Sequence, residues 1–189
     1  MFAYHVITDK PIQLGKQMIF DKTHHNGVYK RVYDKIEIVN DIYKNPTKYN
    51  FDSLEYPVMV ALRELALEEV RLEKYPAYPS RMSCLYVSKT LKEADDWGKY
   101  FAEIGRPTYS IAKLEIKGNC FVGDATKCFD GRLDKQENIR LAETYWENKH
   151  NDSNNPPICE MLVDGTITVI EIIKEINANI ELSSGNRLA

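Results

Sequence analysis

Several features that would place the sequence in a known functional class are missing. No apolar run approaches the roughly 18 residues of a membrane-spanning helix, so we expect no transmembrane segment and no membrane partner. Residues 1–5 lack the basic and apolar regions of a secretory signal, which favours a cytoplasmic location. No glycine-rich loop follows an expected strand, so neither the dinucleotide-binding fingerprint nor the phosphate-binding P-loop is present.

Cysteines are few and widely spaced. No two of them lie two to four residues apart, the spacing typical of zinc sites, and we therefore predict no metal centre. We also expect four free thiols rather than a disulfide framework, as is usual for proteins of a reducing compartment. The four residues are Cys84, Cys120, Cys128 and Cys159.

The net charge and the length of the chain say little about its binding partner but indicate the number of domains. The net charge of −3 is too small to predict a polyanion or a polycation as partner. The 189 residues, 43% of them hydrophobic, are enough for one apolar core. We predict one domain over residues 1–182 followed by a loose tail over 183–189. The sequence leaves a homodimer open.

Hydrophobic periodicity predicts strands and helices in an order that favours an α+β fold over a doubly wound parallel sheet, because helices come early and strands cluster late. In the helix expected over 57–73, Leu72 belongs to the apolar side, and Glu64 and Arg71 belong to the opposite side. The expected strands cover 2–8, 82–88, 108–116, 119–122, 158–163 and 166–176, and the expected helices cover 28–45, 57–73, 91–105 and 133–147.

Two residue types stand out as candidates for chemistry. His5 lies in the middle of the first expected strand, where it either satisfies a backbone group or serves a site, whereas the remaining histidines fall in polar loops. Glu160 lies in an otherwise apolar strand, where a charge is costly unless it is paired or faces a cleft. It can also point outward at the strand edge, because side chains alternate along a strand. Both alternatives for Glu160 stay open at this point.

Three short segments, spread along the chain, carry a histidine, a tyrosine and a glutamate in that order. The first, Tyr-His-Val-Ile-Thr, contains His5. The second, Leu-Tyr-Val-Ser, contains Tyr86 and leads into a helix of the form x-x-x-Ala-x-x-Trp. The third, Cys-Glu-Met-Leu-Val, contains Glu160. Together they resemble the His-Tyr-Glu branch of the ADP-ribosyltransferase-like superfamily, which includes diphtheria toxin and the poly(ADP-ribose) polymerases. The chain also resembles a small bacterial family of uncharacterised conserved domains.

The resemblance implies a split, mostly antiparallel sheet flanked by helices, with NAD bound as a substrate in the cleft between its halves. By position, His5 would hydrogen-bond the adenosine-side ribose and the nicotinamide amide region, and Tyr86 would stack on the nicotinamide ring. Glu160 would be the catalytic residue and would hold the 2′-hydroxyl of the nicotinamide ribose. Thr8 and Ser88, the polar residues that end the first two segments, complete the expected NAD-binding set.

The sequence departs from this pattern at three places. Cys84 stands where a glycine usually lies two residues before the tyrosine. A second aromatic residue against the nicotinamide is not evident, and Trp97 and Tyr100 are the candidates. Ile158 replaces the Glu or Gln of the branch that modifies arginine, which disfavours arginine as the acceptor.

Three hypotheses about function follow. The first is an enzyme that transfers ADP-ribose from NAD to a protein, a nucleic acid or a small molecule. The second is an inactive protein of the same fold with a binding or regulatory role, which a cleft plugged by side chains would favour. The third is an NAD-dependent RNA 2′-phosphotransferase-like enzyme, against which the net charge of −3 argues.

Overall fold

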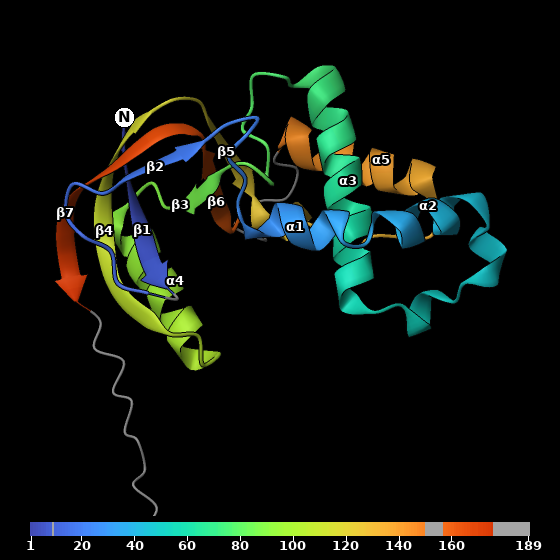
Figure 1. The fold of residues 1–189 in the computed structure, drawn as a ribbon, viewed down its shortest axis with the longest axis horizontal. Helices are drawn as coiled ribbons and strands as arrows, with labels where there is room; N and C mark the ends of the chain where they lie inside the picture. The colour runs from blue at the N-terminus through green and yellow to red at the C-terminus, as the bar shows by residue number, and fades with distance from the viewer. Residues whose placement is uncertain (9, 150–156, 176–189) are drawn as a thin grey trace, which may run out of the picture.

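The computed structural model of the protein describes residues 1–8, 10–149 and 157–175. The expected tail over 183–189, His150 and most of the polar loop that follows it lie outside the described residues. Figure 1 shows a half built mainly of strands beside a half built mainly of helices. The elements are β1 (Phe2–Thr8), β2 (Gln17–Phe20), α1 (Gly27–Tyr33), α2 (Ile36–Lys44), α3 (Tyr56–Lys74), β3 (Leu85–Val87), α4 (Leu91–Glu103), β4 (Thr108–Lys117), β5 (Cys120–Asp124), α5 (Lys135–Glu147), β6 (Cys159–Val163) and β7 (Gly165–Glu175), with short 3₁₀ helices at Pro46–Lys48, Phe51–Ser53 and Ala125–Lys127.

The strands form two antiparallel sheets. The larger has the order β1-β4-β7-β2 and the smaller the order β3-β6-β5. They meet where Tyr4 of β1 and Ser88 after β3 exchange two backbone hydrogen bonds, with N···O distances of 2.8 and 2.7 Å. The mixed helix and strand content with antiparallel pairing confirms the α+β prediction.

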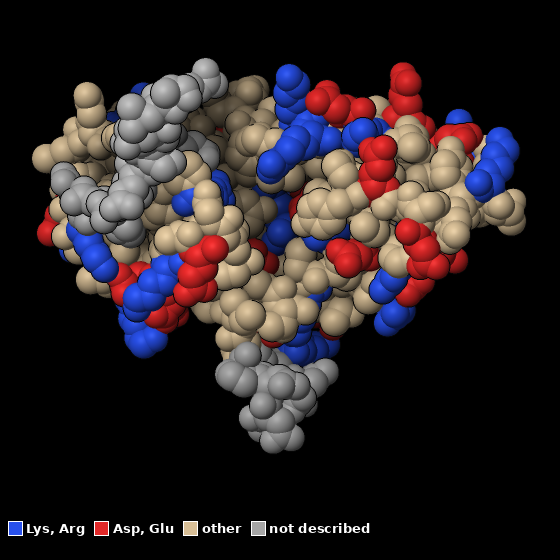
Figure 2. Space-filling view, turned by 90° about the horizontal axis from the view of Figure 1, so that it is seen from below, with Lys and Arg blue, Asp and Glu red and all other residues tan. Residues whose placement is uncertain are grey.

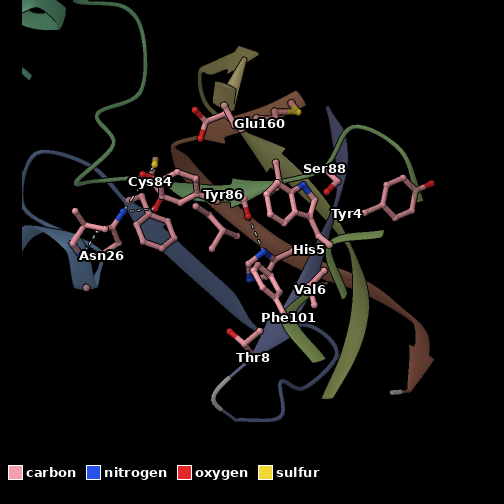
Figure 3. Close-up of a pocket in the computed structure, with 18 of the residues that line it drawn as sticks. Tyr4, His5, Val6, Thr8, Asn26, Cys84, Tyr86, Ser88, Phe101 and Glu160 are labelled. Atoms are coloured by element: carbon pink, nitrogen blue, oxygen red, sulfur yellow. Dashed lines mark hydrogen bonds between the residues drawn. The ribbon is translucent and has the colours of Figure 1, made fainter. Parts of the chain in front are cut away.

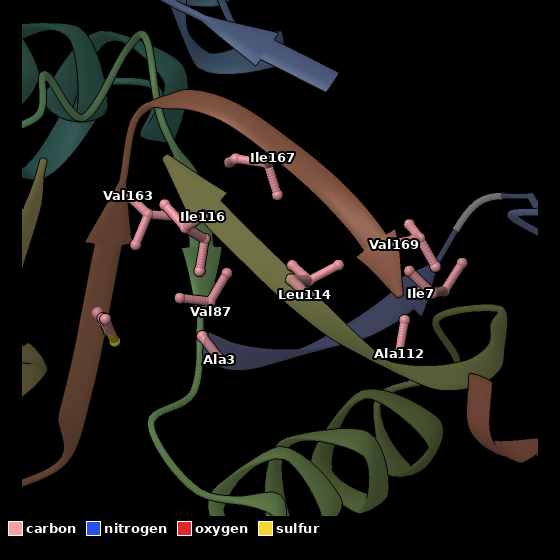
Figure 4. Close-up of a cluster of buried hydrophobic side chains, with 10 residues drawn as sticks. Ala3, Ile7, Val87, Ala112, Leu114, Ile116, Val163, Ile167 and Val169 are labelled. Atoms are coloured by element: carbon pink, nitrogen blue, oxygen red, sulfur yellow. The ribbon is translucent and has the colours of Figure 1, made fainter. Parts of the chain in front are cut away.

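The main apolar core fills the space enclosed by the two sheets. Leu114 from β4, Ile167 from β7 and Val163 from β6 are fully buried there, and Figure 4 shows these side chains converging from several strands. Burial alternates along β4 from Ala112 to Lys117, because successive side chains point to opposite faces of a sheet. On the opposite face of β1 and β4, Val6 and Ile111 pack against Ala94 of α4.

Helix α4 begins where the sequence predicts, at a capping box. The Thr90 hydroxyl accepts a hydrogen bond from the Glu93 backbone N–H, and the Glu93 carboxylate accepts one from the Thr90 backbone N–H. These bonds satisfy two amide groups that the first turn would otherwise leave unpaired. The cap fixes the start of α4 directly after β3, and α4 then packs against β1 and β4.

Helix α3 is buried on more sides than its sequence indicates. It packs against α5, α1 and α2, so that Glu64 is only 2% exposed and Arg71 only 8%. The sequence placed these two residues opposite the apolar side of the helix and Leu72 on the apolar side, yet Glu64 and Arg71 are buried and Leu72 is 60% exposed. Both buried charges are compensated by ion pairs. Glu64 pairs with Arg63 and Arg81, and Arg71 pairs with Glu68.

Two expected elements need correction, and one element was not expected. The helix expected over 28–45 is two helices, because the chain turns between Tyr33 and Ile36. The edge strand β2 was not anticipated. The strand expected over 82–88 is reduced to Leu85–Val87, since the Asn26 amide binds the carbonyl oxygens of Arg81 and Cys84 and holds the preceding residues in a turn. Within the described residues, no helix is both long and apolar enough to cross a membrane.

Candidate functional site

A cavity of about 600 Å³ opens at the junction of the two sheets. Its size lies within the range of roughly 300–1,000 Å³ typical of small-molecule sites. The structure brings together in its lining all five residues named from the sequence: His5, Thr8, Tyr86, Ser88 and Glu160. Figure 3 shows Glu160 and Thr8 toward opposite ends of the group, with Tyr86 and His5 between them.

His5 projects from β1 and is fixed by the neighbouring sheet. Its Nδ1 atom lies 2.8 Å from the backbone carbonyl oxygen of Tyr86. Because a carbonyl oxygen only accepts, Nδ1 carries the hydrogen and Nε2 of the neutral ring is an acceptor. Burial, with a further contribution from the Arg106 charge, lowers the pKa of His5 from 6.5 to about 4 despite the favourable bond to Tyr86. His5 is therefore neutral at physiological pH.

Tyr86 projects from β3 and is held at its hydroxyl end. The hydroxyl donates to the backbone carbonyl oxygen of Arg81 over 3.2 Å, and the Arg81 guanidinium carbon lies 5.4 Å from the ring centroid. Burial raises the pKa of Tyr86 well above its ordinary value, so the phenol stays protonated. The ring thus offers an immobilised aromatic face at the cavity.

Glu160 projects from β6 and is ion-paired with a residue that sequence patterns did not single out. Nη1 of Arg81 donates to Oε1 of Glu160 over 2.9 Å, and the Glu160 side chain is 12% exposed. The same Nη1 donates to the hydroxyl of Tyr145 over 2.6 Å. Of the two alternatives drawn from the sequence, the structure shows the first, because Glu160 is paired and lines the cavity. It does not point outward at a sheet edge, since β6 is the central strand of its sheet.

Arg81 connects Glu160 to helix α3. Its Nε donates to Oε2 of Glu64 over 2.9 Å, and Nη2 lies 3.7 Å from Sγ of Cys128. Burial alone would raise the pKa of Glu64, but the adjacent Arg81 and Arg63 charges hold it below its ordinary value. Two carboxylates and two guanidinium groups thus form a balanced buried network.

Aromatic side chains make up a further part of the cavity wall. Trp97 and Phe101 of α4 line it, and their ring centroids are 5.7 Å apart. Tyr100, the other aromatic candidate from the sequence, is 48% exposed and is not part of the lining. Phe20 of the unanticipated strand β2 also contributes. Trp97 was a candidate from the resemblance, whereas Phe101, four residues further along the same face of α4, was not named as a site residue.

Two arginines add positive charge to the lining. Arg31 comes from α1, and Arg106 follows α4. Figure 2 shows a hollow between the two halves of the molecule in which basic and acidic side chains both lie. From the sequence, Arg31 is one of several scattered basic residues near the N-terminus, and Arg106 was not singled out because it lies in none of the three recognisable segments.

Cys84 forms a further part of the cavity wall. Cys84 lines the cavity but is only 1% exposed, and its thiol donates to the Arg81 carbonyl oxygen over 3.6 Å. Burial raises the pKa of this thiol well above its ordinary value, so it is not a ready nucleophile. All four cysteines are free. No cluster of three or more potential metal ligands occurs among the described residues.

Comparisons with known proteins place the chain in a family without assigning an activity. No curated protein matches the sequence. One family model, described as a protein of unknown function (DUF2441), matches residues 3–175, which include every residue that lines the cavity. The chain belongs to this DUF2441 family.

Proposed function

We propose that the cavity binds NAD and that the protein transfers ADP-ribose from NAD to an acceptor. The observation that carries the proposal is the convergence of His5, Tyr86 and Glu160 on one open cavity. These residues come from three segments separated by more than 70 positions each. They were named from a sequence resemblance, and two of the three are also joined directly by the His5–Tyr86 hydrogen bond.

The chemistry of the lining suits the parts of NAD. Tyr86, Trp97 and Phe101 offer apolar faces for flat rings. Arg31 and Arg106 offer cationic groups for the diphosphate. Nε2 of neutral His5 accepts a hydrogen bond, and a ribose hydroxyl can donate one.

In the proposed reaction, the bond between C1′ of the nicotinamide ribose and the pyridinium nitrogen breaks. Its electron pair moves to that nitrogen, so nicotinamide leaves as a neutral molecule and positive charge develops on the ribose. The Glu160 carboxylate would stabilise this charge and accept a hydrogen bond from the 2′-hydroxyl. A carboxylate has about four acceptor positions, so Glu160 can bind Arg81 and a ligand at once. The acceptor then bonds to C1′ and releases its proton, and water as acceptor gives free ADP-ribose.

One observation favours the second candidate, an NAD-binding protein without turnover. Oε1 of Glu160 already accepts from Arg81, and this ion pair reduces the charge available to the substrate. The open volume of about 600 Å³ argues in either case for a ligand, because side chains do not plug the cavity.

Two measurements on the purified protein test the proposal. At one hundred times its Kd, NAD stabilises the folded state by about 2.7 kcal/mol. For a chain of this size, the melting temperature should rise by about 5–10 °C. Release of nicotinamide from NAD, followed by chromatography, tests turnover. A thermal shift without nicotinamide supports the second candidate, and no shift at millimolar NAD contradicts both.

Two variants on helix α4 provide a matched control for the binding site. Trp97 lines the cavity, whereas Tyr100, one turn further along the same helix, does not. The Trp97→Ala variant should lose most of the NAD-induced thermal shift, because an aromatic wall is removed. The Tyr100→Ala variant should keep it. Equal shifts in both variants would place NAD elsewhere on the protein.

A further inference from the structure

Arg81 contacts two of the three residues in the proposed site while lying outside the cavity lining. Its guanidinium group donates to Glu160 and stacks over the ring of Tyr86. Arg81 is 7% exposed and is not among the residues that line the cavity. It therefore cannot act on a ligand directly, but it can fix the residues that do.

Glu64 holds Arg81 in turn from the rigid helix α3. The Nε atom of Arg81 donates to Oε2 of Glu64, and Oε1 of Glu64 accepts from Nε of Arg63 over 3.0 Å. The planar guanidinium presents its donors in fixed directions, so binding at Nε sets where Nη1 points. The position of Nη1 then determines where Oε1 of Glu160 lies, 2.9 Å away.

We propose that Glu64 and Arg81 are positioning residues that hold the Glu160 carboxylate at the cavity for the proposed transfer reaction. The inference rests on the proposed function. A network kept only for stability is a weaker explanation, because well-packed apolar residues usually stabilise a core at least as well as a buried ion pair. Misplacement of a reacting group by about 1 Å costs roughly 100-fold in rate, so precise placement has value at such a site.

The kinetic test compares Glu64→Gln with Glu68→Gln. Glu68 lies one turn along the same helix and is also paired with an arginine, Arg71. Its carboxylate accepts from the Ser80 hydroxyl rather than from the Arg81 guanidinium. For Glu64→Gln, kcat for nicotinamide release should fall about 10- to 100-fold with little change in KM. Glu68→Gln should keep the wild-type kcat. Equal kcat values for both variants overturn the inference while leaving the proposed function intact.

A thermal test gives a readout that does not depend on NAD. Glu64 and Glu160 share Arg81, so the melting-temperature shifts of Glu64→Gln and Glu160→Gln should not add in the double variant. The shifts of Glu68→Gln and Glu160→Gln should add. Additive shifts for the first pair overturn the inference at any level of activity. The first pair can give non-additive shifts while the wild type releases no nicotinamide. These two results together support the Glu64–Arg81–Glu160 coupling and contradict only the proposed function.

Discussion

The two halves of the molecule bury different kinds of side chain. Within the described parts of the chain, the core enclosed by the two sheets contains ten buried apolar residues, among them Leu114 and Ile167. Around helix α3, by contrast, the charged residues Glu64, Arg71 and Arg81 are buried together with apolar neighbours. Arg81 donates to the Glu64 carboxylate, and Arg71 donates to the backbone carbonyl oxygen of Tyr78. The cavity lies where these two kinds of interior meet.

The difference shows which interactions specify the fold and which serve the site. An apolar core contributes stability roughly in proportion to the apolar area it buries, and this contribution does not depend on a particular direction between side chains. A buried ion-pair network contributes little net stability, but it is strongly destabilised when one member is removed. The sheets therefore provide the scaffold, and the charges behind Glu160 provide the geometry of the site.

Among the variants that test this comparison, Arg81→Met should change the free energy of unfolding most. The change keeps much of the side-chain volume but leaves the Glu64 and Glu160 carboxylates without a shared cation. The free energy of unfolding should fall by about 3–5 kcal/mol, measured by urea denaturation. Arg140→Met, at an exposed position of α5, should change it by less than about 0.5 kcal/mol. Similar values for the two variants would show that the network is dispensable for folding.

The dependence of stability on pH should separate the two halves. His5 has its pKa lowered to about 4 in the folded state, so the unfolded chain binds more protons between pH 6.5 and pH 4. Its contribution, at most about 3 kcal/mol, is complete above pH 6.5 and is lost as the pH falls toward 4. The lowered pKa of Glu64 acts in a more acidic range: its contribution is complete above pH 4.5 and is lost below it.

The His5→Gln variant tests the contribution of His5 to stability between pH 6.5 and pH 4. Glutamine does not titrate, so the loss of stability between pH 6.5 and 4 should be smaller in the variant than in the wild type, whatever its stability at neutral pH. Denaturation curves at half-unit pH steps give the two slopes. Parallel slopes would mean that His5 is solvated and titrates normally.

The smallest effect is expected within the apolar core. Ile167→Val removes one methylene group from a fully buried position of β7 and should cost about 1 kcal/mol. Ile170→Val, on the same strand but 38% exposed, should cost less than about 0.5 kcal/mol. Neither variant should alter the pH profile of stability. A pH-dependent loss in Ile167→Val would mean that packing of the apolar core is coupled to the titration of His5 or Glu64.

Local patterns predicted most of the fold. β1, α3 and α4 were expected close to their observed bounds, because each has a continuous periodicity and α4 has a capping box. The break between α1 and α2 was missed because Val32, Val39 and Ile42 keep helical spacing across it. The strand β2 was missed because its four residues pair only with β7 at the sheet edge.

The candidate site was predictable only where a residue lay in a recognisable segment. His5, Tyr86 and Glu160 were named from such segments, and all three line the cavity. Arg81 and Glu64 were missed because their roles depend on tertiary contacts. Arg81 pairs with Glu64, 17 positions away, and with Glu160, 79 positions away. Helical periodicity placed Glu64 opposite the apolar side of α3, and periodicity does not reveal that other elements cover that side as well.

The rate of nicotinamide release by wild type and Glu160→Gln tests the central claim most directly. Glutamine keeps the shape and an acceptor for Arg81 but removes the negative charge. The account predicts that the wild type releases nicotinamide from NAD and that the variant does so about 10²–10³-fold more slowly. NAD affinity should change little, because the interaction grows mainly in the transition state. Equal rates in the two proteins, or no release by the wild type, would contradict an ADP-ribosyl transfer site at Glu160.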